Sequence, residues 1–139
     1  MAKPAKKHRS SCPIAFAVDI IGDRWSLLII RDLLFNGCRT YGNFLDAGEG
    51  IATNVLADRL KELERRGLVS KERDPDDQRR SLYSLSDKGR DLAPAVVELI
   101  YWSAVHDPES TLPAAYRERI ESDRDGLITE LRARSVSSS

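Results

Sequence analysis

The chain has 139 residues, a length that fits one domain, and its 22 basic side chains balance its 22 acidic ones, so that the net charge is zero. This balance argues against a protein that wraps nucleic acid through bulk positive charge. No apolar run approaches the ~18 residues that a membrane span needs, and two cysteines are too few for a disulfide scaffold. We therefore expect a cytoplasmic domain that makes no membrane contact.

The zero net charge hides an asymmetry along the chain. Residues 1–90 hold 17 basic and 13 acidic side chains, whereas residues 91–139 hold five and nine. This distribution indicates an anionic partner for the first part and a different role for the last. Residues 1–11 are basic and have no apolar stretch behind them, so we expect a disordered basic arm rather than a secretory signal.

Apolar periodicity predicts two helices in the first part of the chain. Pro13 suits the first position of a helix that has apolar side chains three and four residues apart and ends at Gly22. Asp23 is placed to cap a second helix over residues 24–35. Because the middle of that second helix is apolar all round, we expect it to be central in the fold.

The strongest periodic pattern lies in residues 53–66. Leu56, Leu60 and Leu63 form an apolar stripe there, while polar and charged side chains occupy the opposite face. A brief helix over residues 41–45 precedes it, across a Gly-Glu-Gly turn. The long helix is therefore expected to bury its leucines and to leave its polar face in solvent.

A hairpin and two further helices follow. Residues 68–73 and 81–85 are strand-like, and the Asp-Pro-Asp-Asp sequence between them predicts a turn. Helices are predicted over about 87–105, where Pro94 either kinks the helix or delays its start, and over about 113–134.

This order of elements predicts a fold that is mainly α with a small β-hairpin, a winged helix-turn-helix with C-terminal dimerisation helices. The glycine that ends the long helix and the charged hairpin tip are the most telling features. The expected parts are the basic arm (1–11), the winged helix-turn-helix domain (12–106), a helical extension for dimerisation (107–134) and a disordered tail (135–139).

Several short motifs, taken together, resemble those of the HxlR-type bacterial transcriptional regulators, which are MarR-related winged-helix proteins. They follow the family's order and come near its spacing. The matching segments are 12–13, 19–25, 30–33, 39–44, 50–60, 63–64, 67–69 and 83–89. The resemblance implies a homodimer that binds a palindromic operator in double-stranded DNA. We predict a sequence-specific repressor that responds to an electrophile, an oxidant or another small-molecule effector.

The chain departs from the family pattern in three places. The hairpin sequence at 74–80 looks more like the wing of a MarR protein. Ala52 stands where many members carry a serine that caps the long helix, and most members lack the final helix beyond Asp107. These departures bear on the ligand and the dimer more than on the fold.

The residue types agree with a DNA-binding role. Thr53 and Asn54 begin the long helix, where a recognition helix meets base edges, and asparagine pairs well with adenine in the major groove. Arg79 and Arg80 occupy the hairpin tip, which suits a phosphate or a narrow minor groove. The further DNA-binding candidates are Arg39, Asp58, Lys61, Arg65 and Lys71.

Two alternatives stay open for these side chains. Lys61, Arg65 and Lys71 fit the role of ordinary solvated charges as well as that of phosphate contacts. Asp76 and Asp77 beside the hairpin arginines would repel phosphate unless they pair with those arginines or turn away.

Cys12 is a candidate redox sensor. It stands at the predicted start of a helix, where backbone N–H groups and the helix dipole favour the thiolate. The family resemblance adds that a cysteine here senses quinones, aldehydes or oxidants in some members. The alternative is a cysteine buried against the dimer partner and inert. Cys38, between two elements, is expected to be a small filler of the core.

Nothing in the sequence predicts an enzyme. His8 lies in the arm and His106 follows a predicted helix, and neither has a serine or cysteine partner close by in the sequence. Without a glycine-rich phosphate loop, a Cys-x-x-Cys motif or a metal-ligand cluster, we expect no metal and no cofactor. The alternative to a DNA-binding regulator is a winged-helix module that binds only proteins, for which no salt-dependent DNA binding is expected.

Overall fold

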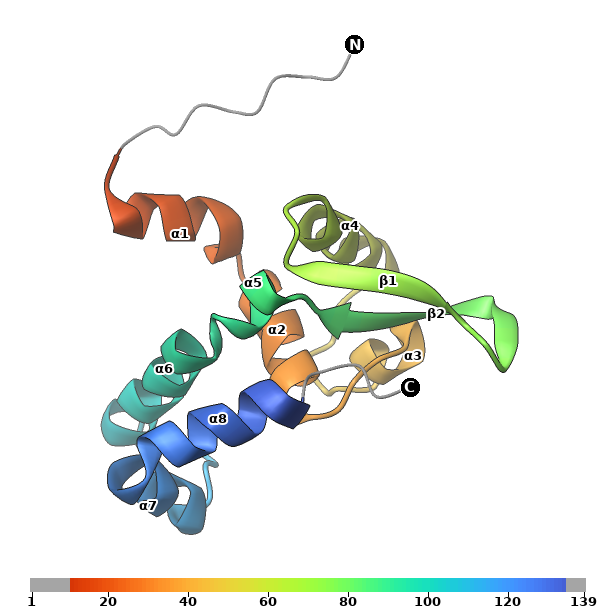
Figure 1. Ribbon diagram of the computed structural model, residues 1–139. Coiled ribbons are helices and arrows are strands. Elements are labelled where there is room, and N and C mark those ends of the chain that lie inside the picture. Colours follow the sequence, from red (N-terminus) through yellow and green to blue (C-terminus); the bar gives the residue numbers. More distant parts are fainter. Residues whose placement is uncertain (1–10, 135–139) are drawn as a thin grey trace.

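Helix α2 (Ser26–Phe35) runs through the middle of the molecule, and the other elements pack against it or against its neighbours (Figure 1). The computed structural model describes residues 11–134; the arm predicted over residues 1–11, apart from its last residue, and the predicted tail lie outside the described residues. The fold is mainly α with one two-stranded antiparallel hairpin, as the sequence predicts. The elements are α1 (Pro13–Ile21), α2 (Ser26–Phe35), α3 (Tyr41–Leu45), α4 (Thr53–Arg65), β1 (Val69–Asp74), β2 (Asp77–Leu85), α5 (Asp87–Arg90), α6 (Ala93–His106), α7 (Ala114–Ser122) and α8 (Arg124–Arg134).

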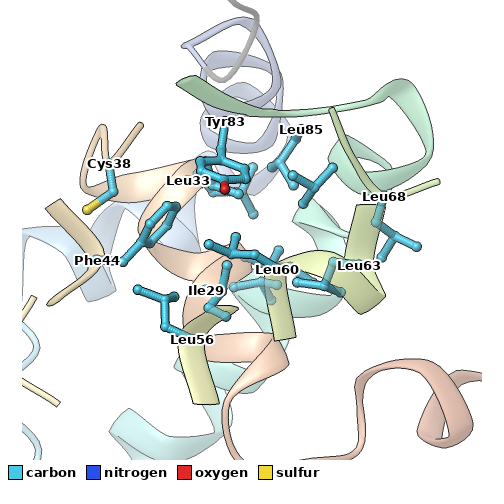
Figure 2. Close-up of a cluster of buried hydrophobic side chains, with 14 of the residues drawn as sticks. Ile29, Leu33, Cys38, Phe44, Leu56, Leu60, Leu63, Leu68, Tyr83 and Leu85 are labelled. Carbon is cyan, nitrogen blue, oxygen red and sulfur yellow. The ribbon is translucent and has the colours of Figure 1, made fainter. Parts of the chain in front are cut away.

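The main core joins α2 to α4 and the hairpin. The predicted leucine stripe of α4 is confirmed, since Leu56, Leu60 and Leu63 are each no more than 1% exposed. They lie among side chains of α2 such as Ile29 and of the hairpin (Figure 2). Burying each such side chain contributes about 1.5–3 kcal/mol, so these contacts fix the rotation of α4 about its own axis. The polar face of α4 is consequently turned to solvent.

The N-cap position of α2 is Trp25 rather than the predicted Asp23, because the helix begins two residues later than predicted; Asp23 instead holds the turn that leads into it. Its Oδ2 accepts hydrogen bonds from the backbone N–H groups of Trp25 and Ser26, both at 3.0 Å, and its Oδ1 accepts one from the Ser26 hydroxyl at 2.5 Å. The first two bonds satisfy backbone N–H groups at the start of α2 that have no partner inside the helix.

The segment after the hairpin forms two helices rather than the single predicted one. Ser86 caps the short α5 by accepting a hydrogen bond from the Gly89 N–H at 3.1 Å. Pro94 then stands in the first turn of α6, where its missing N–H costs nothing. Of the two effects predicted for this proline, the delayed helix start is the one observed.

The prediction of one helix over 113–134 is wrong. The backbone at Asp123 leaves the helical region, with φ −149° and ψ 56°, and separates α7 from α8. The carboxylate of Asp123 then accepts a hydrogen bond from the Gly126 N–H at 3.2 Å, in the first turn of α8. An aspartate that can bond to the backbone ahead of it favours a helix start over helix continuation.

The C-terminal helices bury their apolar stripe in their own chain. Ile120, Leu127 and Leu131 are at most 2% exposed and form a second core with Val97 of α6. This leaves little of the predicted stripe for a dimer partner. In the described part of the chain, no helix combines the length and apolar character that crossing a bilayer requires.

We predict that Gly89→Ala destabilises the fold. A Cβ at this position would collide with the Leu68 carbonyl oxygen and with Leu85 Cδ2, so α5 would have to move off the hairpin. Such overpacking costs about 1–3 kcal/mol in the free energy of unfolding, measurable by urea denaturation.

Gly42→Ala is the matched control for this prediction. A Cβ on Gly42 would meet only Thr40 Oγ1, at 3.9 Å, and the residue lies within helix α3. We expect its unfolding free energy to rise by about 0.4–1 kcal/mol, because alanine restricts the unfolded chain. Equal stabilities for the two variants would contradict the packing described for α5.

Candidate nucleic-acid interface

The first turn of α4 is held in place by α3. The Tyr41 hydroxyl donates a hydrogen bond to the Thr53 carbonyl oxygen at 2.8 Å. α3 is itself closed by a capping box, in which Thr40 Oγ1 accepts from the Asn43 N–H while Asn43 Oδ1 accepts from the Thr40 N–H, both at 3.1 Å. Thr53 and Asn54 are exposed on this fixed turn. This role of Tyr41 is not predicted from the sequence. The sequence offers only one hint of it, which is that an aromatic residue begins the helix before α4.

Ala52 stands before α4 as the sequence places it, and its side chain makes no capping hydrogen bond. Its carbonyl oxygen accepts from the Leu56 N–H at 2.9 Å, the first backbone bond of the helix. Exposed N–H groups at such a helix start favour an anion, for example a DNA phosphate.

The exposed face of α4 carries compensated charges. Asp58, 67% exposed, pairs with Arg59 at 2.5 Å. Arg65 donates to both oxygens of Glu62, at 2.9 and 2.6 Å. Lys61 is exposed and makes no ion pair with the residues that the structure describes. Lys61 is therefore better placed than Arg65 to bind a phosphate, because it has no ion pair to break within the described part of the chain.

Glu62 accepts hydrogen bonds from two arginines of this helix end, Arg65 and Arg66. The hydrogen bond from Arg65 is the largest influence on its pKa and, together with a weaker one from Arg66, lowers it from 4.5 to about 2; burial, whose effect ranks between the two, opposes them. The carboxylate therefore stays ionised over the physiological pH range, and both arginines keep their partner. Their stabilising effect is lost only as pH falls from about 4.5 through about 2.

The two arginines of the hairpin tip have different surroundings. Arg80 donates to Oδ2 of the buried Asp74 at 2.9 and 2.6 Å. The side chain of Arg79 is 92% exposed and has only a 3.4 Å contact with Asp77. Of the two acidic neighbours that the sequence analysis considers, Asp77 does pair with a hairpin arginine, Arg79, although the contact is long. Because Arg79 is so exposed and weakly paired, it is more available to a phosphate than Arg80.

Asp74 organises the turn between β1 and β2. Besides Arg80, it accepts a hydrogen bond from the Asp76 N–H at 2.8 Å. That backbone bond first, and the Arg80 bond next, hold the pKa of Asp74 below its usual value. The strands extend beyond their predicted ends, since Asp74 and Asp77 face each other across an irregular last pair.

Arg39 and Lys71 lie where the hairpin meets the segment before α3. The Arg39 carbonyl oxygen accepts from the Tyr83 N–H at 2.8 Å, which joins this segment to β2. The Arg39 guanidinium is 3.9 Å from Glu72, and Lys71 is exposed on β1. The hairpin lies alongside α4, and its tip projects beyond the rest of the molecule (Figure 1).

The two cysteines differ sharply. Cys12 is exposed and precedes the first residue of α1, where the backbone N–H groups of Ala15 and Ile14 lower the pKa of its thiol. Cys38 is buried, its Sγ lies 3.7 Å from the Asn43 carbonyl oxygen, and burial raises its pKa. The filler role predicted for Cys38 agrees with this position.

A second surface is apolar. Although the predicted apolar pattern of α1 exists, no residue of that helix is buried. α1 and α6 lie on the side of the molecule away from the hairpin tip (Figure 1). We define the apolar face as the large exposed apolar side chains of these helices, which are Ile14, Phe16, Val18, Leu99, Trp102 and Val105.

The described residues contain no group of three or more His, Cys, Asp or Glu side chains that could hold a metal ion. The candidate site consists of the start of α4, its exposed face and the hairpin tip. Its chemistry is that of hydrogen-bond donors, a few cations and a protruding hairpin, which suits a polyanion better than a small substrate.

Comparison with known proteins agrees with this description. The sequence model of the HxlR-like helix-turn-helix family matches residues 20–111. An HTH-type transcriptional regulator of Synechocystis sp., sll1512, is 36% identical over 98 residues, which cover 70% of this chain and 72% of the relative.

Two solved structures are similar to this fold. PA1607, described as a transcription factor, is 36% identical with a TM-score of 0.68, covering 76% of this chain and 73% of its own. The redox regulator HypR in its oxidised form is 28% identical with a TM-score of 0.61, covering 68% and 97%.

We predict that the Asp74–Arg80 pair orders the hairpin tip. Replacing Arg80 with glutamine leaves Asp74 without its cation, so amide hydrogen exchange at Asp76 and Asp77 should speed up about tenfold, as expected for a lost bond between charged groups. Arg79→Gln is the control and should leave exchange within about twofold. Equal acceleration in both variants would contradict the different roles assigned to these arginines.

Proposed function

The chain belongs to the HxlR-like helix-turn-helix family of DNA-binding transcriptional regulators, and we propose that it acts in the cytoplasm as a repressor that binds a palindromic operator as a homodimer. One observation carries the proposal: Thr53 and Asn54 are exposed on a helix turn that Tyr41 and the buried leucines hold in a fixed orientation. A recognition helix needs such rigidity, because base readout depends on side chains placed at defined positions.

The hairpin and the α4 cations support a division of labour. Asn54 is suited to read a base edge in the major groove, whereas Lys61 and Arg79 are suited to phosphates. Arg65 and Arg80 already have carboxylate partners, so their share in DNA affinity is smaller. With a net charge of zero, the protein binds non-specific DNA weakly and depends on these few contacts.

Selection of bound duplexes from a random DNA pool tests DNA binding and reports the operator. We expect a palindrome with half-sites about one helical turn, ~34 Å, apart. On that operator Asn54→Ala should cost about 1–3 kcal/mol and relax specificity at one position of each half-site, whereas Arg79→Ala should weaken all sequences alike and reduce the salt slope by about 1.

Arg119→Ala, on α7 and away from the candidate interface, is the control and should leave DNA affinity unchanged. Failure of the selection to enrich any sequence, together with no salt-dependent binding, would reject the proposal. That outcome would favour the alternative, a winged-helix module that binds proteins only.

The apolar face supports homodimerisation through α1 and α6. Ile14 is 71% exposed and Trp102 is 63% exposed, which is costly for large apolar side chains in water. Exposed apolar side chains of this size favour burial against a partner. The C-terminal extension, to which the sequence assigned dimerisation, offers less apolar surface because its stripe is buried in its own chain.

Sedimentation at micromolar concentration tests this interface. We expect a dimer for the natural chain and a monomer for Trp102→Arg, because burying an unpaired cation in the interface is strongly unfavourable. Ala115→Glu, at an exposed position of α7, is the control and should remain dimeric. A dimer in Trp102→Arg that is lost in Ala115→Glu would return the dimerisation role to residues 107–134.

A redox response through Cys12 is a second proposal, and one observation favours it: the thiol is exposed and its pKa is lowered at the start of α1. A lower thiol pKa raises the thiolate fraction that reacts with oxidants. HypR, which resembles this chain, is a redox regulator.

Operator binding before and after diamide tests this role. Diamide takes two electrons and two protons from two thiols, which join as a disulfide between two copies of Cys12. We expect operator affinity to change severalfold in the natural chain and not in Cys12→Ser. Unchanged affinity in both proteins would reject the sensor role.

A further inference from the structure

A groove of about 740 Å³ opens between α2, α6 and the segment that joins α6 to α7. This volume lies within the range of small-molecule sites, roughly 300–1,000 Å³. Its apolar lining includes Leu28 and Phe35 of α2, Val96 and Ile100 of α6, and Leu112 of the joining segment. The segment from Ser110 to Tyr116 belongs to the extension predicted over residues 107–134, so the groove depends on that part of the chain.

The groove is lined by two cations, and one of them has no carboxylate partner within the described residues. Of the ionisable groups that line it, Arg31 and Arg134 are cations, Glu49 is a carboxylate and Tyr116 is a neutral phenol. Arg134 donates to the Phe35 carbonyl oxygen at 3.1 Å and makes no ion pair within the described residues. Arg31 has carboxylate partners, and so Arg134 is, among the described residues, the cation at the groove whose charge is left for a ligand.

Arg31 donates hydrogen bonds to two carboxylates, those of Asp32 and Glu49. Its Nε and Nη2 donate to Asp32 Oδ1 at 3.0 and 2.8 Å, and Asp32 is buried. Its Nη1 donates to Glu49 Oε1 at 3.2 Å, and the Glu49 side chain is 38% exposed. The Glu49 bond is the longer and more solvated of the two, and so it is the weaker one.

We propose that this groove binds a small amphipathic anion, whose acid group replaces Glu49 on Arg31 and whose apolar part lies between α2 and α6. The guanidinium keeps its bonds to Asp32 and so remains oriented for the ligand. The aromatic ring of Phe35, which lies 5.9 Å from that of Tyr116, favours a ligand with a planar ring.

Displacement of Glu49 would be transmitted to the DNA-binding surface, a consequence that rests on the proposed function. Glu49 lies between Gly48 and Gly50, whose φ values of +90° and +72° form the turn just before α4. Arg31 holds that turn on α2 through Glu49. Releasing it frees the segment that leads into Thr53 and lowers operator affinity.

The fluorescent anion 8-anilinonaphthalene-1-sulfonate and its uncharged counterpart N-phenyl-1-naphthylamine test the site without DNA. The natural chain should bind one anion per protomer. Arg31→Gln should weaken the anion about tenfold or more and leave the neutral compound within about twofold, because only the anion uses the guanidinium. Arg119→Gln, an ion-paired arginine outside the groove, is the control.

Two further variants make the outcome independent of misfolding. Glu49→Gln removes the competing carboxylate and should tighten the anion severalfold, which damage to the fold cannot do. Ser103→Phe fills the groove and should abolish binding of both compounds. No saturable anion binding, equal weakening of both compounds by Arg31→Gln, or weaker anion binding in Glu49→Gln would overturn the proposal.

Operator affinity measured with saturating anion then separates this inference from the proposed function. Lower operator affinity in the natural chain, with no change in Arg31→Gln, supports the transmission through Glu49. Unchanged affinity in both overturns the transmission while the site stands. Anion binding as expected in a protein that binds no selected DNA would leave the site intact and reject the proposed function.

Discussion

The burial of three leucines of α4 against α2 is the contact on which the remaining structure depends. Leu56, Leu60 and Leu63 are almost fully removed from solvent, so α4 cannot rotate without exposing them. The orientation of its polar face follows directly from this packing. Tyr41 then fixes the beginning of the helix through the Thr53 carbonyl oxygen. A hydrophobic constraint thus determines which polar side chains face a partner.

α2 contacts both the winged part of the molecule and its C-terminal helices. One side of it packs against α4 and the hairpin, while its other contacts lead to α6 and α8. Arg31 and Asp32 stand on this helix, between the groove formed by the C-terminal extension and the turn before α4. The extension therefore packs against the winged core at α2, and its own apolar residues are buried within the same chain.

Pairing of charges explains how a chain without net charge suits a specific DNA partner. Arg65 and Arg80 hold carboxylates of their own elements and so shape α4 and the hairpin tip. Lys61 and Arg79 are left more available to a phosphate. Local ion pairs thus contribute to the charge balance and also order the candidate interface. The same balance argues against a protein that binds all DNA sequences alike.

The order and kind of the elements could be predicted from sequence because apolar periodicity and glycine stops are local signals. The leucine stripe of α4 and the bonds of Asp23 to the start of α2 are examples. The break at Asp123 could not be predicted with the same ease, since an exposed aspartate is tolerated within helices as well as at their starts. The Tyr41–Thr53 and Arg80–Asp74 bonds depend on how separate segments meet, and sequence spacing alone does not report that.

Backbone amide chemical shifts recorded while a selected operator duplex is added test the central claim most directly. If packing of α4 on α2 presents the DNA-reading surface, the largest changes fall on the first turns of α4 and on the hairpin tip near Arg79. The amides of Leu60 and Leu63 should shift little, because their side chains stay in the core. Largest changes on α1 and α6, with α4 and the hairpin unaffected, would contradict the account.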